Sequence, residues 1–218
     1  MTAIAVLGAG KVGRTLAAGW VRAGHDVVLG SRTPDTDRLR AAVAETGARR
    51  AATHAVAARA ADLVVVTVPG DQVEALVGDL GAVLRGRPVI DTTNVLTPHA
   101  PVLHHLDVFV AAGAVAFRAL HSTGWEQMAQ PTFDEQRSDM AYAGPDGPAR
   151  AVVDAALADL GFRPIWLGEG PDAVAIADAL ARLWIHLVFT RGWHRRLGLQ
   201  LLTDVDDTHL TAEAREQL

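Results

Sequence analysis

Three glycines near the N-terminus have the spacing of a loop that binds a phosphate group. Gly8, Gly10 and Gly13 form a G-x-G-x-x-G pattern within residues 5–20, AVLGAGKVGRTLAAGW. In such a loop the first glycine permits a tight turn, the second lets the backbone approach a pyrophosphate, and the third lets a helix pack close to a strand. The spacing alone is weak evidence, because a glycine turn needed only for packing has the same pattern.

The segments around these glycines have the patterns of the strand and the helix that a phosphate loop needs. Residues 3–8 are a short apolar run typical of a strand, and apolar side chains then recur at helical spacing until Gly24. A second strand-like run, residues 25–32, follows closely enough for a right-handed βαβ unit. We therefore expect N–H groups at the helix start to bind an anion. The residues of this turn are Gly8, Ala9, Gly10, Lys11 and Val12.

The end of the second strand indicates which dinucleotide would bind. An acidic residue at this place binds the ribose 2′-hydroxyl of NAD, whereas here the sequence reads GSRT. Ser31 can donate a hydrogen bond, and Arg32 can make a forked, charge-assisted contact with a phosphate. These residues favour NADP over NAD; a surface turn with an exposed arginine is the alternative interpretation.

Two further strand ends are expected at the same cleft, since ligands of open α/β sheets bind beyond the carboxyl ends of the strands. The apolar run 62–69 and the segment 88–94 are the strands concerned. We expect the first to place residues along the nicotinamide and its ribose, and the second to place polar groups near the ring amide, although Pro69 is equally explained as the end of a strand. The residues are Thr67, Val68, Pro69, Thr92, Thr93 and Asn94.

The alternation of strand-like and helical patterns predicts an α/β protein with a doubly wound parallel sheet. Helices are expected at 35–48, 71–84, 149–160 and 172–190, and the polar segment 124–139 is expected to be an irregular connection or lid. The predicted domains are residues 1–120 for the nucleotide, a small C-terminal α/β portion at 121–202, and a polar tail at 203–218.

Composition excludes several classes of function. The formal net charge of −5 provides no basic surface for nucleic acid, and the absence of cysteine rules out disulfides and thiolate catalysis. The apolar stretch 173–190 is interrupted by Asp178, Arg182 and His186, and the N-terminus has no pattern of a leader. We expect a cytoplasmic protein without membrane or nucleic-acid partners.

Histidines and a polar stripe are the remaining candidates for chemistry. His121 is expected at a strand end facing the cleft, where it is either a proton donor or a structural histidine. The adjacent pair His104 and His105 is expected on a solvated helix surface, with no metal site. Polar residues recur at every fourth position along the last helix: Asp178, Arg182, His186 and Thr190. This stripe either lines the pocket or forms the solvent face; we favour the solvent face, with the apolar remainder packed against the first domain or a second subunit.

An ordered set of segments resembles the family of coenzyme F420 (deazaflavin)-dependent NADP oxidoreductases. The segments are GAGKVGRTLA, GHDVVLGSR, VVVTVP, DTTN, ALHSTGWEQMAQP, MAYAGPDGPARAVVDAALADLGFRPIWLG and LARLWIHLVFTRG. The resemblance implies a Rossmann-type domain with NADP, its 2′-phosphate held by Ser31 and Arg32, and a deazaflavin stacked on the nicotinamide in the cleft between the domains. It also implies that Leu120, His121 and Ser122 lie in the stretch that contacts the deazaflavin, with Thr123 beside them.

The resulting hypothesis is a hydride exchange between NADP(H) and a small-molecule acceptor, coenzyme F420. Hydride transfer between two rings needs no activated protein nucleophile, and no G-x-S-x-G or H-E-x-x-H motif supports a hydrolase. His121 is the candidate catalytic residue, and a homodimer is expected. The alternatives are NADPH reduction of a flavin, a quinone-like compound or an imine, and a non-catalytic NADP(H) sensor.

Overall fold

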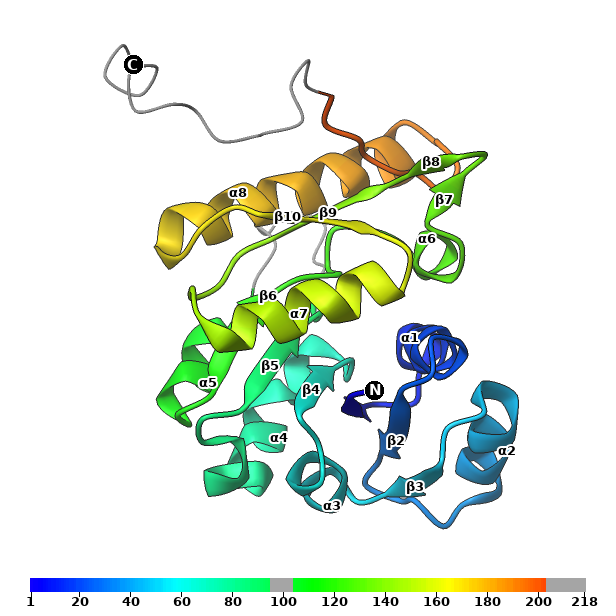
Figure 1. The fold of residues 1–218 in the computed structure, drawn as a ribbon, viewed down its shortest axis with the longest axis vertical. Coiled ribbons are helices and arrows are strands. Elements are labelled where there is room, and N and C mark those ends of the chain that lie inside the picture. Colours follow the sequence, from blue (N-terminus) through cyan, green and yellow to red (C-terminus); the bar gives the residue numbers. More distant parts are fainter. Residues whose placement is uncertain (95–103, 203–218) are drawn as a thin grey trace.

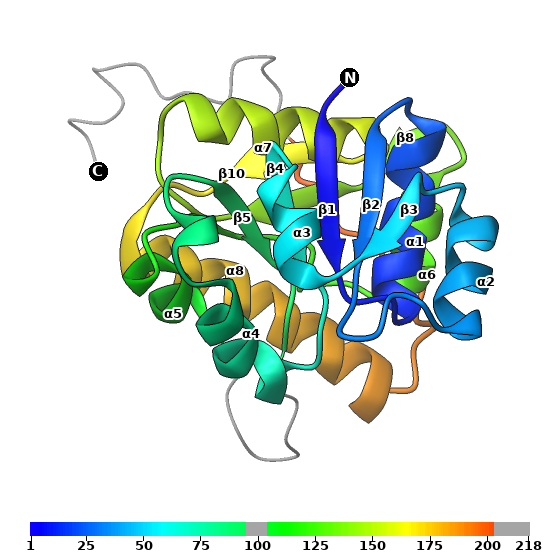
Figure 2. The same cartoon turned by 90° about the horizontal axis from the view of Figure 1, so that it is seen from below.

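A parallel six-stranded sheet forms the centre of the molecule, in a computed structural model that describes residues 1–94 and 104–202. The strand order is β3-β2-β1-β4-β5-β6, and every neighbouring pair is parallel (Figure 2). The strands are β1 (Ala3–Leu7), β2 (Asp26–Gly30), β3 (Arg50–Ala52), β4 (Leu63–Val66), β5 (Pro88–Asp91) and β6 (Val115–Arg118). This order reverses direction between β1 and β4, as in a Rossmann fold. The predicted doubly wound α/β sheet is confirmed.

Helices cover both faces of this sheet because its central strands are apolar on both sides, as the fully buried run Leu63–Val66 shows. One core cluster joins the sheet to α1 and α2, and the other joins it to α3, α4 and α5. The helices are α1 (Lys11–Arg22), α2 (Asp37–Thr46), α3 (His54–Arg59), α4 (Val73–Leu80) and α5 (Leu106–Ala111).

The chain after β6 forms a second, smaller α/β portion (Figure 1). A parallel pair, β9 and β10, is connected through α7, and a short hairpin, β7 and β8, follows α6. Backbone hydrogen bonds between Arg118 and Ala143 join the edge of the main sheet to the chain just after β9. The elements are α6 (Trp125–Ala129), β7 (Thr132–Phe133), β8 (Gln136–Arg137), β9 (Asp139–Tyr142), α7 (Pro148–Asp159), β10 (Arg163–Trp166) and α8 (Gly170–Ile185), which continues as a π-helical turn, His186–Thr190.

The two portions share one hydrophobic core. The Trp20 indole on α1 is fully buried and donates a hydrogen bond of 2.8 Å to the carbonyl of Ala156 on α7. Met140 and Phe162, which lie beyond residue 120, belong to the same buried cluster as Ile4 of β1. The six-stranded sheet ends two residues before the predicted boundary at 120, but the side chains on either side of that boundary pack together.

Several predicted elements differ from the structure. The helix predicted at 71–84 is divided into a 3₁₀ turn, α4 and a second 3₁₀ turn. α4 ends where the chain takes a positive φ of 50° at Gly81. The segment 124–139, predicted to be irregular, contains α6 and the β7–β8 hairpin. The predicted tail, 203–218, lies outside the described residues.

The last helix combines an apolar composition with limited burial. Gly170–Thr190 is long and apolar enough to cross a membrane by length and composition, with a mean hydropathy of 1.5 and 33% of that window buried. Its buried face, which includes Ala173 and Ala177, packs into one of the two core clusters. Part of the apolar character of this helix therefore serves the core of the fold.

The start of α1 packs directly against the turn that leaves β1. A Cβ atom on Gly13 would lie 2.0 Å from the carbonyl oxygen of Gly8, which no real structure tolerates. Gly8 itself has a φ of 117°, a conformation that residues with side chains rarely adopt. At Gly10, in contrast, a Cβ would meet no atom within 4 Å. The packing therefore requires Gly13, the backbone conformation favours glycine at position 8, and neither of these requires Gly10.

We expect Gly13→Ala to destabilise the protein by about 2–3 kcal/mol, because its methyl group would push α1 away from the sheet. Gly10→Ala is the matched control and should change the free energy of unfolding by less than about 1 kcal/mol, since nothing lies near its Cβ. Urea denaturation followed by circular dichroism measures both values. Equal losses for the two variants would contradict the close packing of α1.

Candidate functional site

A cleft of about 800 Å³ opens at the carboxyl ends of β1, β2, β4 and β5. This is the edge at which ligands of open α/β sheets bind. Its lining includes every residue that the sequence analysis assigned to the cofactor: Gly8, Ala9, Gly10, Lys11, Val12, Ser31, Arg32, Thr67, Val68, Pro69 and Asn94. The structure thus brings together four strand ends that are spread over more than 80 positions of the sequence.

The glycine turn offers backbone donors to an anion. Gly10 is the N-cap of α1 and has no side chain to accept a hydrogen bond, so the first-turn N–H groups remain for a ligand or water. The ammonium group of Lys11 lies 4.1 Å from the ring centroid of Trp125, at the border of the cleft. Arg14, one turn further along α1, does not line the cleft; it pairs with Glu45 at 3.3 Å.

The end of β2 is positively charged and contains no competing carboxylate. Ser31, Arg32 and Arg38 line the cleft here, and no aspartate or glutamate belongs to its described lining. The Ser31 hydroxyl oxygen accepts a hydrogen bond of 3.2 Å from the Thr33 N–H, which orients the side chain and leaves its proton free to be donated. A phosphate dianion is favoured at such a place. Arg38 was not among the residues predicted from the sequence.

His54 is a second cleft residue that the sequence analysis missed. It begins α3, directly after β3, and its ring packs against Gly30 at the end of β2. Burial and the nearby charge of Arg32 lower the pKa of His54, so that its ring is neutral at pH 7. The sequence offered one signal for His54, namely its position directly after the short strand β3. That strand also ends at this edge of the sheet, so a residue that follows it is expected near the cleft.

Two threonines fix the strand exits on the other side of the cleft. The Thr67 hydroxyl group shares its one proton between the Gly8 carbonyl, at 2.9 Å, and the Leu7 carbonyl, at 3.1 Å. The Thr92 hydroxyl group donates a bond of 2.8 Å to the carbonyl of Val66. These side chains tie β4 to the glycine turn and β5 to β4, so the relative positions of the cleft walls are set by short polar contacts.

A fully buried arginine holds the exit of β5. Arg118 donates through Nη1 to the Thr93 carbonyl at 2.5 Å and through Nη2 to Asn94 Oδ1 at 2.9 Å. The amide nitrogen of Asn94 in turn donates to the carbonyl of His121 at 2.8 Å. The Asn94 side chain is therefore anchored at both ends on the described residues, and it lines the cleft from this fixed position.

Two buried carboxylates compensate the charge of Arg118. Its guanidinium lies 3.4 Å from Asp91 and 3.0 Å from Asp178 of α8. Burial alone would raise the pKa of Asp178, but the contacts with His121 and the charge of Arg118 outweigh it and hold the pKa below its ordinary value. The prediction that Asp178 faces solvent is therefore wrong. Arg182, His186 and Thr190 of the same stripe are exposed, as predicted.

His121 lies inside this cluster and does not face the cleft. Its side chain has no exposed surface, and neither ring nitrogen has a hydrogen-bond partner among the described residues. Nε2 is 3.2 Å from Asp178 Oδ1, a close contact that does not meet the geometry of a hydrogen bond. Burial, followed by the charge of Arg118, lowers the pKa of His121. The expectation that His121 faces the cleft is corrected, because the chain turns inward after β6.

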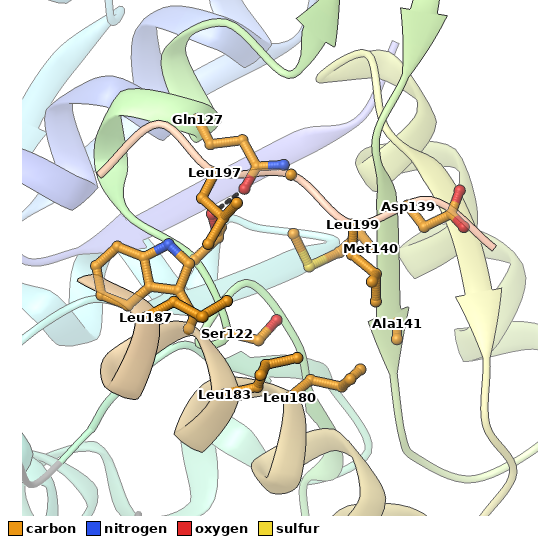
Figure 3. Close-up of a pocket in the computed structure, with 13 residues that line it drawn as sticks. Ser122, Gln127, Asp139, Met140, Ala141, Leu180, Leu183, Leu187, Leu197 and Leu199 are labelled. Carbon is orange, nitrogen blue, oxygen red and sulfur yellow. Dashed lines mark hydrogen bonds between the residues drawn. The ribbon is translucent and has the colours of Figure 1, made fainter. Parts of the chain in front are cut away.

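The residues expected at the acceptor separate into two places. Leu120 is fully buried with a φ of 62° in the turn after β6. Ser122 and Thr123 line a second, mostly apolar pocket of about 90 Å³ (Figure 3). Its other walls come from α6, β9, α8 and the last described segment: Gln127, Asp139, Met140, Ala141, Leu180, Leu183, Trp184, Leu187, Leu197, Gly198 and Leu199.

The adjacent histidines before α5 also differ from the prediction. His104 and His105 precede the helix and are half-buried. The His105 N–H donates to Asp91 Oδ2 at 3.1 Å, and its Nδ1 lies 3.1 Å from the Thr93 hydroxyl group. Within residues 1–94 and 104–202, no group of three His, Asp or Glu residues is placed to hold a metal ion.

Because the pKa of His121 is lowered in the folded state, the unfolded chain takes up a proton there first as the pH falls. The free energy of unfolding should therefore decrease below about pH 6.5. His121→Gln should make this decrease shallower without removing it, since the pKa of His54 is lowered as well. Urea titrations between pH 7.5 and 5 measure the slope.

The matched control is His186→Gln, which removes an exposed histidine from the end of the last helix. The two variants are compared by the slope of stability against pH and not by their absolute stabilities. A slope that His121→Gln leaves unchanged would contradict the buried, neutral state of this ring.

Comparison with known proteins places the chain among NADP-dependent enzymes. Residues 3–95 match the model of the family "NADP oxidoreductase coenzyme F420-dependent". A crystal structure of a candidate F420-dependent NADP-reductase from Arthrobacter sp. FB24 has 25% identity and a TM-score of 0.77, and the match covers 93% of this chain and 100% of that one. No curated protein sequence matches the chain.

Other solved structures share the fold at lower identity. A hypothetical protein, SMa0349 from Sinorhizobium meliloti, has 23% identity and a TM-score of 0.66 over 78% of this chain and 86% of that one. An imine reductase from Streptomyces aurantiacus has 22% identity and a TM-score of 0.64 over 85% of this chain and 61% of that one. The resemblance stated from the sequence is confirmed over residues 3–95, and the chain is an NADP-dependent oxidoreductase that is similar over those residues to the coenzyme F420-dependent family.

Proposed function

We propose that the protein transfers hydride between NADP(H), bound in the 800 Å³ cleft, and a deazaflavin of the coenzyme F420 type. The observation that carries the cofactor assignment is the end of β2, where Ser31, Arg32 and Arg38 line the cleft and its described lining holds no carboxylate. A carboxylate there would repel the 2′-phosphate, whereas these three side chains offer a hydroxyl group and two guanidinium groups to it.

The position of the 2′-phosphate at the end of β2 determines which cleft residues the rest of the dinucleotide would contact. A pyrophosphate would lie at Gly10, where the backbone is uncovered and the α1 N-terminus points its free N–H groups. The nicotinamide half would then extend toward Val68, Pro69 and Asn94 on the exits of β4 and β5. Bound NADPH would supply the hydride, and the protein's part is to orient the ring and exclude water around it.

The family description supports a deazaflavin as the acceptor. A ring system of that size exceeds the 90 Å³ pocket, so it would stack over the nicotinamide in the open cleft. His121 is not assigned a catalytic contact in this proposal because its ring has no exposed surface. Its backbone carbonyl accepts the hydrogen bond of the Asn94 amide and so helps to hold that cleft residue.

The 90 Å³ pocket favours a second candidate acceptor, a small imine or carbonyl compound. Its lining is largely leucine, methionine and tryptophan side chains, and Ser122 and Thr123 also belong to it. Figure 3 shows Ser122 among the leucine side chains of this pocket. An apolar substituent of a small acceptor fits such a pocket, which a deazaflavin ring does not. The chain also shares its fold with an imine reductase and with NADPH complexes of an Aspergillus terreus reductive aminase.

A homodimer remains part of the proposal. Ile176, Leu183 and Phe189 on the last helix are 52%, 47% and 60% exposed. Apolar side chains of this size on one helix are typical of surfaces that pair with another protein. The predicted cytoplasmic location, without membrane or nucleic-acid partners, is kept as a prediction.

Arg32→Ala should weaken NADPH binding about 10- to 100-fold, because a charge-assisted hydrogen bond to the 2′-phosphate contributes about 1.5–3 kcal/mol. NADH binding should change little. Arg50→Ala, an exposed arginine on neighbouring β3 that does not line the cleft, is the control and should leave both affinities unchanged. Calorimetric titration gives the four dissociation constants. Equal losses of NADPH and NADH affinity in Arg32→Ala would refute the 2′-phosphate assignment.

The acceptor is tested by following NADPH absorbance with coenzyme F420, with free flavin, and with small cyclic imines in turn. We expect turnover with F420, and Ala141→Leu, which fills the small pocket, should leave that turnover unchanged. Turnover only with imines, abolished by Ala141→Leu, would replace F420 by the second candidate. Tight NADPH binding without any turnover would show a sensor and overturn the enzymatic proposal.

A further inference from the structure

Arg118 occupies an unusual position between the sheet and the C-terminal helix. It is the last residue of β6 and has no exposed surface. Its backbone pairs with Ala143 after β9, its Nε donates to Asp178 of α8, and its terminal nitrogens donate to Thr93 and Asn94 beyond β5. One side chain thus connects α8 with the wall of the cleft.

The energetics of this site require all of these partners. A buried guanidinium without compensation is strongly unfavourable, so the ion pairs with Asp91 and Asp178 are needed for the fold to hold it there. The planar guanidinium reaches Asp178, the Thr93 carbonyl and Asn94 with three different nitrogens. Lysine could not replace it, because a single ammonium group cannot reach all three partners.

Among these partners, Asn94 depends on Arg118 more than Asp91 does. Asp91 also accepts hydrogen bonds from the Thr93 N–H, the Thr93 hydroxyl group and the His105 N–H. Asn94 Oδ1, in contrast, accepts its hydrogen bond from Arg118 among the described residues. Loss of the guanidinium would therefore remove one of the two anchors of the Asn94 side chain and leave only its bond to the His121 carbonyl, while the Asp91 turn keeps its other bonds.

We propose that Arg118, held in place by Asp178, is a positioning residue that fixes Thr93 and Asn94 at the nicotinamide end of the cleft. It does not line the cleft itself and acts through these two lining residues. This inference rests on the proposed binding of NADP(H). Helix α8 would then help to orient the nicotinamide ring, although the 2′-phosphate site lies elsewhere, at the end of β2.

The test compares two ligands that share the adenosine half. NADPH reaches both ends of the cleft, whereas 2′,5′-ADP contains the 2′-phosphate but no nicotinamide. In Arg118→Lys we expect the affinity for NADPH to fall about tenfold, close to one lost hydrogen bond to a charged group, with the affinity for 2′,5′-ADP unchanged. Asp178→Asn retains an oxygen that can accept a hydrogen bond from Arg118 Nε. We therefore expect a smaller loss of NADPH affinity in this variant, again with the affinity for 2′,5′-ADP unchanged.

The matched control is Arg163→Lys. Arg163 also makes a two-pronged pair with a buried aspartate, Asp139, at 2.6 and 2.8 Å, but it lies on β10 and does not line the cleft. It should lower the melting temperature without changing the ratio of the two affinities. With an acceptor that turns over, Arg118→Lys should also lower kcat more than it raises the KM for NADPH, because the ring is misaligned for transfer.

Failure of the inference and failure of the proposed function give different results. Unmodified protein that does not bind NADPH, or that binds NADH equally well, overturns the proposed function and with it the inference. Normal binding by the unmodified protein, with equal losses of both ligands in Arg118→Lys and Asp178→Asn, or with no loss, overturns the inference alone. If Arg118→Lys does not fold, Asp178→Asn decides by the same ratio.

Discussion

The cleft depends on one close approach, that of α1 to the turn after β1. Because Gly13 has no side chain, the helix begins against the carbonyl of Gly8, and the same carbonyl accepts the hydroxyl hydrogen bond of Thr67. The helix N-terminus, β1 and β4 are therefore held as one rigid corner. An uncovered Gly10 sits at this corner, so the free N–H groups of the helix point at open space and not at a side chain. A dinucleotide proposed for this cleft would meet that corner with its most negative part.

Charge is distributed unevenly around this corner, and this distribution has functional consequences. The molecule has a net charge of −5, so attraction of a phosphate must come from local groups. Lys11, Arg32 and Arg38 provide them along the cleft, whose described lining lacks carboxylates. The nearby carboxylates of Asp91 and Asp178 are instead buried around Arg118 and pair with its charge. Their negative potential is thereby compensated inside the protein, away from the cleft.

The C-terminal portion contributes more than a cover for the sheet. The Trp20–Ala156 hydrogen bond and the backbone bonds between Arg118 and Ala143 make it continuous with the nucleotide-binding sheet. Asp178 brings α8 into the charge cluster, so the helix and the β5 exit share an ion pair. A shift of α8 would therefore alter the site through a rigid contact, and the apolar outer surface of the same helix is where a second copy is proposed to bind.

The sequence by itself determined the features that depend on neighbouring residues. Strand and helix periods, the glycine turn and the Ser31–Arg32 end of β2 are local patterns, and parallel topology then requires all strand ends to meet at one edge. The burial of Asp178 and His121 was decided only by the tertiary structure. A polar residue at helical spacing has the same pattern whether it meets water or a partner, and Arg118, the partner of Asp178, lies 60 positions away in the chain. Pairing across such a distance is a property of packing, which no local period encodes.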